Sequence, residues 1–331
     1  MSLSGHFWTI WPTLAGHAWP ALSPRPTPWE AIVHDGSRGA VRLTGELREP
    51  PNAKSPDAKG LVIVVPGLGG NAKSVYIRKA VRDLCRLGWA SLVMPQRGGD
   101  LCGEDIYHAS LTADLHAAAG SPVACAYEHV YVLGFSMGGH VALRFAADSP
   151  PARVRAVAAV CSPIDLFAAS RFIDQPRCRL YRWHVMRALK KIYRAVEHAG
   201  HGTTPLGKVL AANKIREWDT LTIVPRFGFR DANDYYARAS VAAALPNLTA
   251  RSLLLLSTRD PMVAAGDVRR ALPNVTPKLE VQWHACGGHV HFPRRFRLIE
   301  RVCDWFAAQA QGNALQGTAQ PPVAEERSAA G

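Results

Sequence analysis

The sequence lacks the patterns that mark several classes of protein. Seven cysteines occur in 331 residues, but their number is odd, their spacing is irregular and no C-x-x-C pair is present. Neither a disulfide framework nor a structural zinc site is therefore predicted, and reduced thiols favour a cytoplasmic location. No internal repeat is visible, and no nucleic-acid-binding motif accompanies the basic residues, so we expect no nucleic-acid partner.

The N-terminus lacks the features of a targeting segment. Residues 1–22 are apolar and aromatic, but no basic stretch precedes them, and two prolines and two histidines interrupt them. They fit neither a signal peptide nor a membrane-spanning helix. We expect residues 1–28 to form an arm that packs on the body of the protein, with interfacial membrane contact through its tryptophans as the alternative.

Positive charge, by contrast, is in excess. The formal net charge is +13, and residues 171–216 contain 11 Lys or Arg against only two acidic residues. A solvated, basic helical face explains this excess, and peripheral contact with an anionic membrane surface is the functional alternative. The sequence does not indicate an oligomeric state.

Strand and helix patterns alternate along most of the chain. Apolar runs bounded by turn residues predict strands at 29–34, 40–47, 61–65, 89–94, 129–134, 154–160, 252–257 and 279–284. Amphipathic stretches predict helices at 74–87, 111–119, 140–147, 264–272 and 294–310. The first two strands read as a hairpin. We therefore predict an α/β fold, with a mostly parallel sheet, antiparallel N-terminal strands and helices on both faces.

The alternation breaks between residues 162 and 249, which are basic, aromatic and helix-prone, with helices expected at 178–197 and 206–217. This segment lies between two sheet strands, so we predict a helical cap over the strand ends that shapes the substrate pocket. The core then comprises 29–161 and 250–310. Residues 311–331 are rich in Ala, Gln, Pro and Gly and are predicted to be disordered.

One motif predicts chemistry. The strand that ends near Gly134 leads into Gly134-Phe135-Ser136-Met137-Gly138, and helix formers follow. This is the G-x-S-x-G pattern of a nucleophile elbow, in which a strained turn exposes a serine hydroxyl between a strand and a helix. Glycine suits the flanking positions because the tight turn leaves no space for side chains. We predict Ser136 as a nucleophile.

A serine nucleophile needs an acid and a base, in the chain order Ser, acid, His for this type of elbow. For the acid, Asp260 follows the strand at 252–257, and Asp165 after the preceding strand is the rival. We favour Asp260, because its place and order fit.

For the base, the loop after the last strand holds three histidines, His284, His289 and His291. We favour His289, which follows two glycines that let the loop project it toward Ser136, ahead of His291 and then His284. A metal site is the less favoured interpretation of these histidines, because no carboxylate or cysteine ligand pattern surrounds them.

Two backbone N–H groups should stabilise the oxyanion. We expect them from Met137, just after the nucleophile, and from Leu68 in the glycine-rich loop after the strand at 61–65. That loop is not a P-loop, since no G-K-[S/T] follows it. Phe135, Gly67 and Gly69 are expected at the substrate pocket.

These motifs together resemble the α/β-hydrolase superfamily and, within it, the AB-hydrolase type 4 family that includes the YheT-like bacterial hydrolases. The resemblance covers roughly residues 15 to 307. It rests on six segments: 16–22 (GHAWPAL), 66–77 (PGLGG with Tyr76-Ile77), 96–99 (QRGG), 107–114 (YHASLTAD), 231–240 (DANDYYARAS) and 287–290 (GGHV). Pro66 departs from the family, which usually has His there, and this should alter the shape of the loop more than the oxyanion site.

The resemblance implies that Ser136, Asp260 and His289 form a catalytic triad and that no metal or organic cofactor is required. It implies a serine esterase acting on small-molecule or lipid esters through an acyl-enzyme. An acyltransferase, or a non-catalytic protein that binds lipid or a partner, is the alternative. Four further motif residues are interpreted as structural, in a buried ion pair or aromatic packing: Arg97, Asp114, Tyr235 and Tyr236.

Overall fold

The computed structural model describes residues 4–9, 24–36, 38–51, 59–274 and 276–310. The predicted disordered tail at 311–331 and most of the predicted N-terminal arm therefore lie outside the described residues. Within the described part, no helix is both long enough and apolar enough to cross a membrane.

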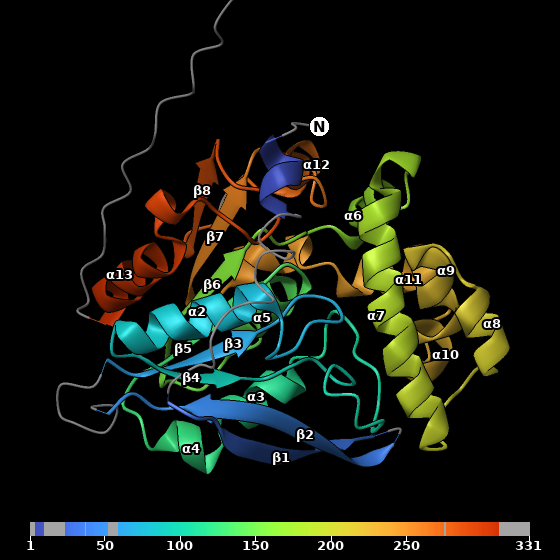
Figure 1. The fold of residues 1–331 in the computed structure, drawn as a ribbon, viewed down its shortest axis with the longest axis horizontal. Coiled ribbons are helices and arrows are strands. Elements are labelled where there is room, and N and C mark those ends of the chain that lie inside the picture. The colour runs from blue at the N-terminus through green and yellow to red at the C-terminus, as the bar shows by residue number, and fades with distance from the viewer. Residues whose placement is uncertain (1–3, 10–23, 37, 52–58, 275, 311–331) are drawn as a thin grey trace, which may run out of the picture.

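Eight strands form one sheet in the order β1-β2-β4-β3-β5-β6-β7-β8 (Figure 1). They are β1 (Thr27–Asp35), β2 (Gly39–Arg48), β3 (Leu61–Val65), β4 (Ala90–Val93), β5 (Val130–Phe135), β6 (Val154–Val160), β7 (Arg251–Ser257) and β8 (Leu279–His284). The pairs β1–β2 and β2–β4 are antiparallel, and all the other pairs are parallel. The predicted α/β fold with an antiparallel start is confirmed.

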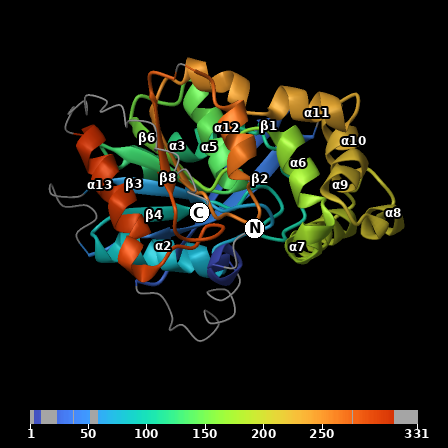
Figure 2. The same ribbon diagram turned by 90° about the horizontal axis from the view of Figure 1, so that it is seen from above.

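Helices cover both faces of the sheet, as Figures 1 and 2 show. One face carries α2 (Val75–Arg86) and α13 (Leu298–Ala310), and the other carries α3 (Ala113–Ala119), α4 (Pro122–Cys125), α5 (Met137–Ala147) and α12 (Ala265–Ala271). Strand β3 is buried throughout. Its alternate residues enter two separate cores: Val62 and Val64 pack on the α2 side, and Ile63 packs on the α5 side.

Six helices between β6 and β7 gather beside the sheet (Figure 1), and we call them the cap. They are α6 (Leu166–Ile173), α7 (Arg179–His198), α8 (Leu206–Ala211), α9 (Ile215–Leu221), α10 (Ile223–Phe227) and α11 (Ala232–Ala239). They share their own hydrophobic core, which includes Trp218, Tyr235 and Tyr236. The aromatic packing predicted for the two tyrosines is present.

Two predicted helix boundaries are wrong. The helix expected at 206–217 is two helices, because the N–H groups of Asn213 and Lys214 donate to the Glu217 carboxylate and start α9 anew. The helix expected at 294–310 begins only at Leu298. A short 3-10 turn precedes it, and Arg297 has a left-handed backbone, with φ at +52°.

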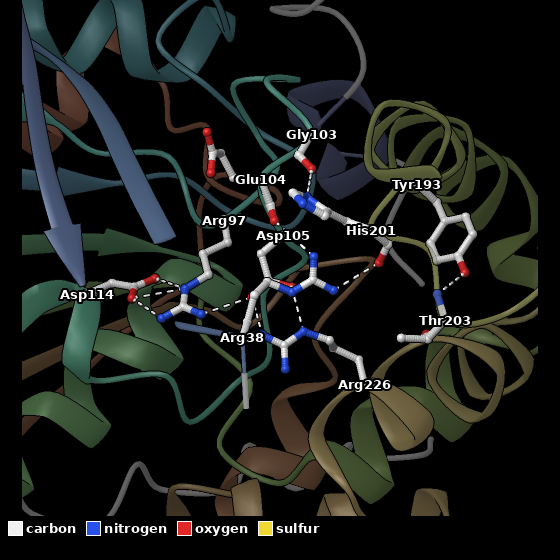
Figure 3. Close-up of polar contacts among 10 residues, drawn as sticks. All are labelled: Arg38, Arg97, Gly103, Glu104, Asp105, Asp114, Tyr193, His201, Thr203 and Arg226. Carbon is white, nitrogen blue, oxygen red and sulfur yellow. Dashed lines mark hydrogen bonds and ion pairs between the residues drawn. The ribbon is translucent and has the colours of Figure 1, made fainter. Parts of the chain in front are cut away.

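A buried ionic cluster ties the cap to the core (Figure 3). Asp105, which is fully buried, accepts hydrogen bonds from Arg97 at 3.0 Å and from Arg226 of α10 at 2.7 Å. Arg97 also donates to Asp114 of α3, at 2.8 Å, in the ion pair expected from the sequence. Arg38, at the β1–β2 turn, donates to the carbonyl of His201 in the cap. The cluster therefore joins the sheet hairpin, the core and the cap.

Candidate active site

Ser136 lies in a strained turn between β5 and α5. Its backbone has φ at +52° and ψ at −121°, which a residue with a side chain rarely adopts. A Cβ at Gly138 would overlap the carbonyl oxygens of Val65 and Pro66, and one at Gly134 would overlap the turn of α5. The two glycines therefore allow the close backbone approach that the predicted elbow requires.

The structure brings the predicted serine, acid and histidine together. His289 Nε2 lies 2.9 Å from Ser136 Oγ, and His289 Nδ1 lies 2.9 Å from Asp260 Oδ2. Asp260 and His289 occupy the loops after β7 and β8, and both are buried. The three side chains therefore meet at the carboxyl ends of parallel strands, where sites in open α/β sheets form.

The hydrogen bonds of Asp260 fix the tautomer of His289. Its Oδ1 accepts the backbone N–H groups of Met262 and Val263, at 2.8 and 3.0 Å, which orients the carboxylate. An ionised carboxylate only accepts, so the proton of neutral His289 resides on Nδ1. Nε2 is then free to accept the proton of the Ser136 hydroxyl, as general-base activation of a serine requires.

The rival acid and one rival base have other contacts. The Asp165 carboxylate accepts the Ala168 N–H at 3.1 Å and caps the start of α6. The His284 ring packs against Phe296, with ring centroids 4.6 Å apart. No hydrogen bond joins either side chain to the Ser136 site among the described residues.

His291, the other rival base, is buried beside the site but makes no hydrogen bond to Ser136 or Asp260. Neither ring nitrogen has a hydrogen-bond partner among the described residues, and the ring lies edge-on to Tyr76. Burial, followed by the nearby charge of Lys79, lowers the pKa of His291 to about 4. The ring is therefore neutral at physiological pH and contributes to the wall of the cavity.

The loop after β3 approaches Ser136 closely. A Cβ added to Gly67 would lie 3.1 Å from the Cβ of Ser136. Tyr76 anchors this loop, because its hydroxyl accepts the Gly67 N–H at 2.9 Å, and burial raises the pKa of Tyr76 to about 12. The N–H groups of Leu68 and Met137, the predicted oxyanion donors, have no acceptor among the described residues.

A segment that sequence reasoning did not connect with the site contacts the His289 loop. Residues 4–9 form a short helix, and Thr9 Oγ1 accepts the His289 backbone N–H at 2.8 Å. His6 contacts Tyr181 of α7 through a 2.5 Å hydrogen bond. The described part of the N-terminus therefore links the triad loop to the cap. No local pattern around Thr9 signals this contact, because 280 residues separate it from its partner.

Ser136 and His289 open onto a cavity of about 490 Å³ between the core and the cap. Gly67, Gly69, Leu68 and Met137 also line it. Phe135 does not, which corrects the sequence prediction. It is 1% exposed and packs against Tyr76, with ring centroids 5.3 Å apart, in the core between the sheet and α2. It shares this core with Tyr131 and Leu133, the alternate residues of β5, so its side chain lies on the α2 side of the sheet.

The cavity runs from an exposed apolar rim to a buried polar end. Leu180 and Trp183 of α7 line it while being 64% and 61% exposed. Asp219 of α9 and Tyr107 line it as well, and each is only 5% exposed. Asp219 is the one acidic side chain among the described lining residues. Sequence reasoning missed it, since a single acid in a short helix gives no distinguishing pattern.

Asp219 is held by one strong hydrogen bond. The Tyr236 hydroxyl donates to Asp219 Oδ2 at 2.7 Å. Burial raises the pKa of the Asp219 carboxyl to about 7. Perturbed carboxyls of this kind are concentrated at functional sites. Among the described residues, no three His, Cys, Asp or Glu side chains gather as metal ligands would.

The chain is similar to known proteins in both sequence and fold. A model of the alpha/beta hydrolase family matches residues 62–301. YheT of Escherichia coli is 27% identical over 282 residues, which cover 78% of this chain and 80% of that protein. Phospholipase ABHD3 of Mus musculus is 25% identical over 265 residues, or 74% of this chain, and the match spans less than two thirds of that relative, 62%. A solved esterase of Pyrococcus furiosus shares the fold, with a TM-score of 0.56 at 17% identity over 87% of this chain and 92% of its own.

Proposed function

The chain belongs to the alpha/beta hydrolase family, and on that premise we propose that it cleaves carboxylic esters through an acyl-enzyme on Ser136. The observation that carries the proposal is the pair of 2.9 Å contacts that link Ser136 and His289, which line the cavity, with Asp260 behind them. The names of two sequence relatives, esterase for YheT and phospholipase for ABHD3, support ester chemistry, and lipid esters are included in the proposal.

The first half of the reaction forms the acyl-enzyme. Ser136 Oγ attacks the ester carbonyl while His289 Nε2 takes the hydroxyl proton, and Asp260 stabilises the resulting imidazolium. The N–H groups of Leu68 and Met137 donate to the oxyanion. The C–O bond to the alcohol then breaks, and His289 returns the proton to the departing alcohol oxygen.

The second half releases the acid. A water molecule gives a proton to His289 Nε2 and attacks the acyl carbon. The bond to Ser136 Oγ then breaks, and His289 returns the proton to Ser136 Oγ, which restores the free enzyme. An alcohol in place of water would yield a new ester, which is the transferase alternative. We propose that the cap, which lies within the predicted segment 162–249, controls whether water or an alcohol reaches the acyl-enzyme.

The test measures ester cleavage by the full chain and by Ser136→Ala. We expect free acid as the product, with cleavage of p-nitrophenyl butyrate falling to background in the variant. Cleavage that survives in Ser136→Ala would rule out the nucleophile. Adding methanol or glycerol and analysing the products separates hydrolysis from transfer, since a transferase would form new esters in preference to acid.

We also infer that the rim of the cavity contacts anionic lipid surfaces. Leu180 and Trp183 expose apolar surface where the cavity opens, and the Arg187 guanidinium lies 5.6 Å from the centre of the Trp183 ring. Apolar side chains flanked by arginine suit the boundary between acyl chains and anionic headgroups. An ester held in such a surface would enter the cavity without first passing through water.

Vesicle sedimentation tests this contact. We expect binding to vesicles that contain phosphatidylglycerol, weaker binding to pure phosphatidylcholine vesicles, and a clear loss of binding in Leu180→Ser/Trp183→Ser. Ile32→Ser is the matched control, because Ile32 is equally exposed, at 65%, but lies on β1 away from the cavity. Equal binding by all three proteins would contradict the inference. We further propose a cytoplasmic location, which the odd number and irregular spacing of the seven cysteines support.

A further inference from the structure

The buried end of the cavity carries polar atoms that the proposed reaction does not use. Asp219 and Tyr107 line this end. The Asp219 Oδ2 atom accepts from Tyr236, but Oδ1 accepts no hydrogen bond from the described residues. The Tyr107 hydroxyl likewise donates to none of them. Both atoms retain some accessible surface. Because both residues line the cavity, we take this surface to face the cavity.

These atoms lie close enough to influence one another. The charge of Asp219 adds to the burial that raises the pKa of Tyr107 well above its usual value, so Tyr107 stays a neutral hydroxyl. A carboxyl oxygen and a phenol that face one cavity without partners incur a desolvation cost, which a ligand with complementary polar groups would offset. A merely structural carboxyl would have both oxygens satisfied, as the buried Asp105 has.

The two parts of the lining differ in polarity. Leu180 and Trp183 are apolar and exposed at the rim, which suits the apolar acyl chain of an ester, while Asp219 and Tyr107 present polar atoms at the buried end, which suit a polar group. The ester carbonyl must lie at Ser136 between the two ends. Because the acyl chain is apolar, the polar group that matches the buried end is the alcohol part of the ester.

We propose that Asp219 and Tyr107 form a subsite for free hydroxyl groups on the alcohol part of the substrate, which makes polyol monoesters the preferred substrate class. This inference rests on the proposed esterase function. A hydroxyl donates to Asp219 Oδ1, and Tyr107 donates to the same or a neighbouring hydroxyl oxygen. A cationic alcohol is disfavoured, since Arg216 lies near enough to lower the pKa of Asp219 and the surrounding segment is strongly basic.

The test compares two esters that differ only in hydroxyl groups. Monobutyrin, the glycerol monoester of butyric acid, and propyl butyrate share the acyl group and the three-carbon alcohol chain. We expect the full chain to prefer monobutyrin in kcat/KM, and Asp219→Asn to reduce this preference at least about tenfold, chiefly by raising KM for monobutyrin. Tyr107→Phe should reduce it about threefold to tenfold. Asp304→Asn is the control, because Asp304 is exposed on α13.

The outcomes are distinguishable. An equal preference in wild type, Asp219→Asn, Tyr107→Phe and Asp304→Asn would overturn the subsite while leaving Ser136-dependent cleavage intact. Cleavage of both esters that does not depend on Ser136 would instead overturn the proposed function. Butyrylcholine is the third substrate. If Asp219→Asn lowers its cleavage but not that of monobutyrin, the subsite binds cations and the inference is wrong. Should Asp219→Asn fail to fold, Tyr107→Phe carries the test, since it retains the bond between Asp219 and Tyr236.

Discussion

Asp260 Oδ2 accepts a 2.9 Å hydrogen bond from His289 Nδ1, while its other oxygen is committed to two backbone N–H groups. The carboxylate can therefore neither rotate nor exchange its oxygens without losing hydrogen bonds. This relationship fixes which nitrogen of His289 faces Ser136. It also determines how Asp260→Asn would change the position of the proton on His289.

Asp260→Asn should remove catalysis without unfolding the site. The amide oxygen will turn toward the two backbone N–H groups, which places the amide NH2 against His289 Nδ1. Nδ1 must then accept, so the proton moves to Nε2 and the histidine cannot take the Ser136 proton. We expect kcat for p-nitrophenyl butyrate to fall on the order of 10³–10⁴-fold. Asp165→Asn, the same change at the rival acid, should change kcat less than about tenfold, and the reverse result would reassign the acid.

The elbow glycine is expected to tolerate no side chain. Gly138→Ala places a methyl group against the carbonyl oxygens of Val65 and Pro66, and neither backbone atom can move without distorting β3. Thermal denaturation should show a loss of several kcal/mol. Gly207→Ala is the matched control, because a Cβ there meets no atom within 4 Å and lies within α8. It should leave stability unchanged or raise it by up to about 1 kcal/mol.

The buried ionic cluster should contribute strongly to the free energy of unfolding, because it joins the cap to the core. Arg226→Met removes the cap's hydrogen bonds to the fully buried Asp105, and we expect a loss of about 3 kcal/mol in urea denaturation, together with a raised KM. Arg238→Met removes an exposed pair with Asp234 on the same cap and should cost no more than about 0.5 kcal/mol. Similar losses in the two variants would show that the cluster does not anchor the cap.

Asp219 should reduce stability as the pH rises. Its pKa is about 7 in the folded protein, against about 3.9 in the unfolded chain. Between these values only the folded state holds the proton, so the free energy of unfolding falls with rising pH and the penalty is complete above pH 7. Asp219→Asn should therefore be more stable than wild type at pH 8, by on the order of a few kcal/mol. The gain should shrink toward pH 4.5.

Urea denaturation at both pH values checks this sign. Asp304→Asn should show no such pH-dependent gain, because that carboxyl is exposed. If Asp219→Asn were less stable than wild type at pH 8, the carboxylate would be a stabilising structural group, which would weaken the case for a ligand at this end of the cavity.

Local signals in the sequence predicted the sheet and the triad geometry. The apolar run at 61–65 marks β3, because a strand buried on both faces has no position for a polar residue. Glycines two residues before and two residues after Ser136 mark the elbow, because a Cβ at either position would collide with neighbouring backbone. Asp260 and His289 could be chosen because chain order and strand ends restrict the candidates. Each of these signals lies within a few residues of the feature that it predicts.

Features that depend on distant contacts were not predictable. Phe135 was placed at the pocket, but the direction of its side chain depends on the turn at Ser136 and on the packing of Tyr76. The break before α9 depends on a side-chain cap by Glu217 rather than on Gly or Pro. The cavity lining by Asp219 follows from the packing of the cap helices on the core, which periodicity does not encode.

The central claim is that Ser136 is the nucleophile, and covalent labelling tests it most directly. The full chain is treated with a fluorophosphonate, digested and analysed by mass spectrometry. We predict one phosphonate adduct, on the peptide that contains Ser136, with labelling lost in Ser136→Ala and strongly slowed in His289→Ala. An adduct on another residue, or no adduct on a folded protein, would contradict the account.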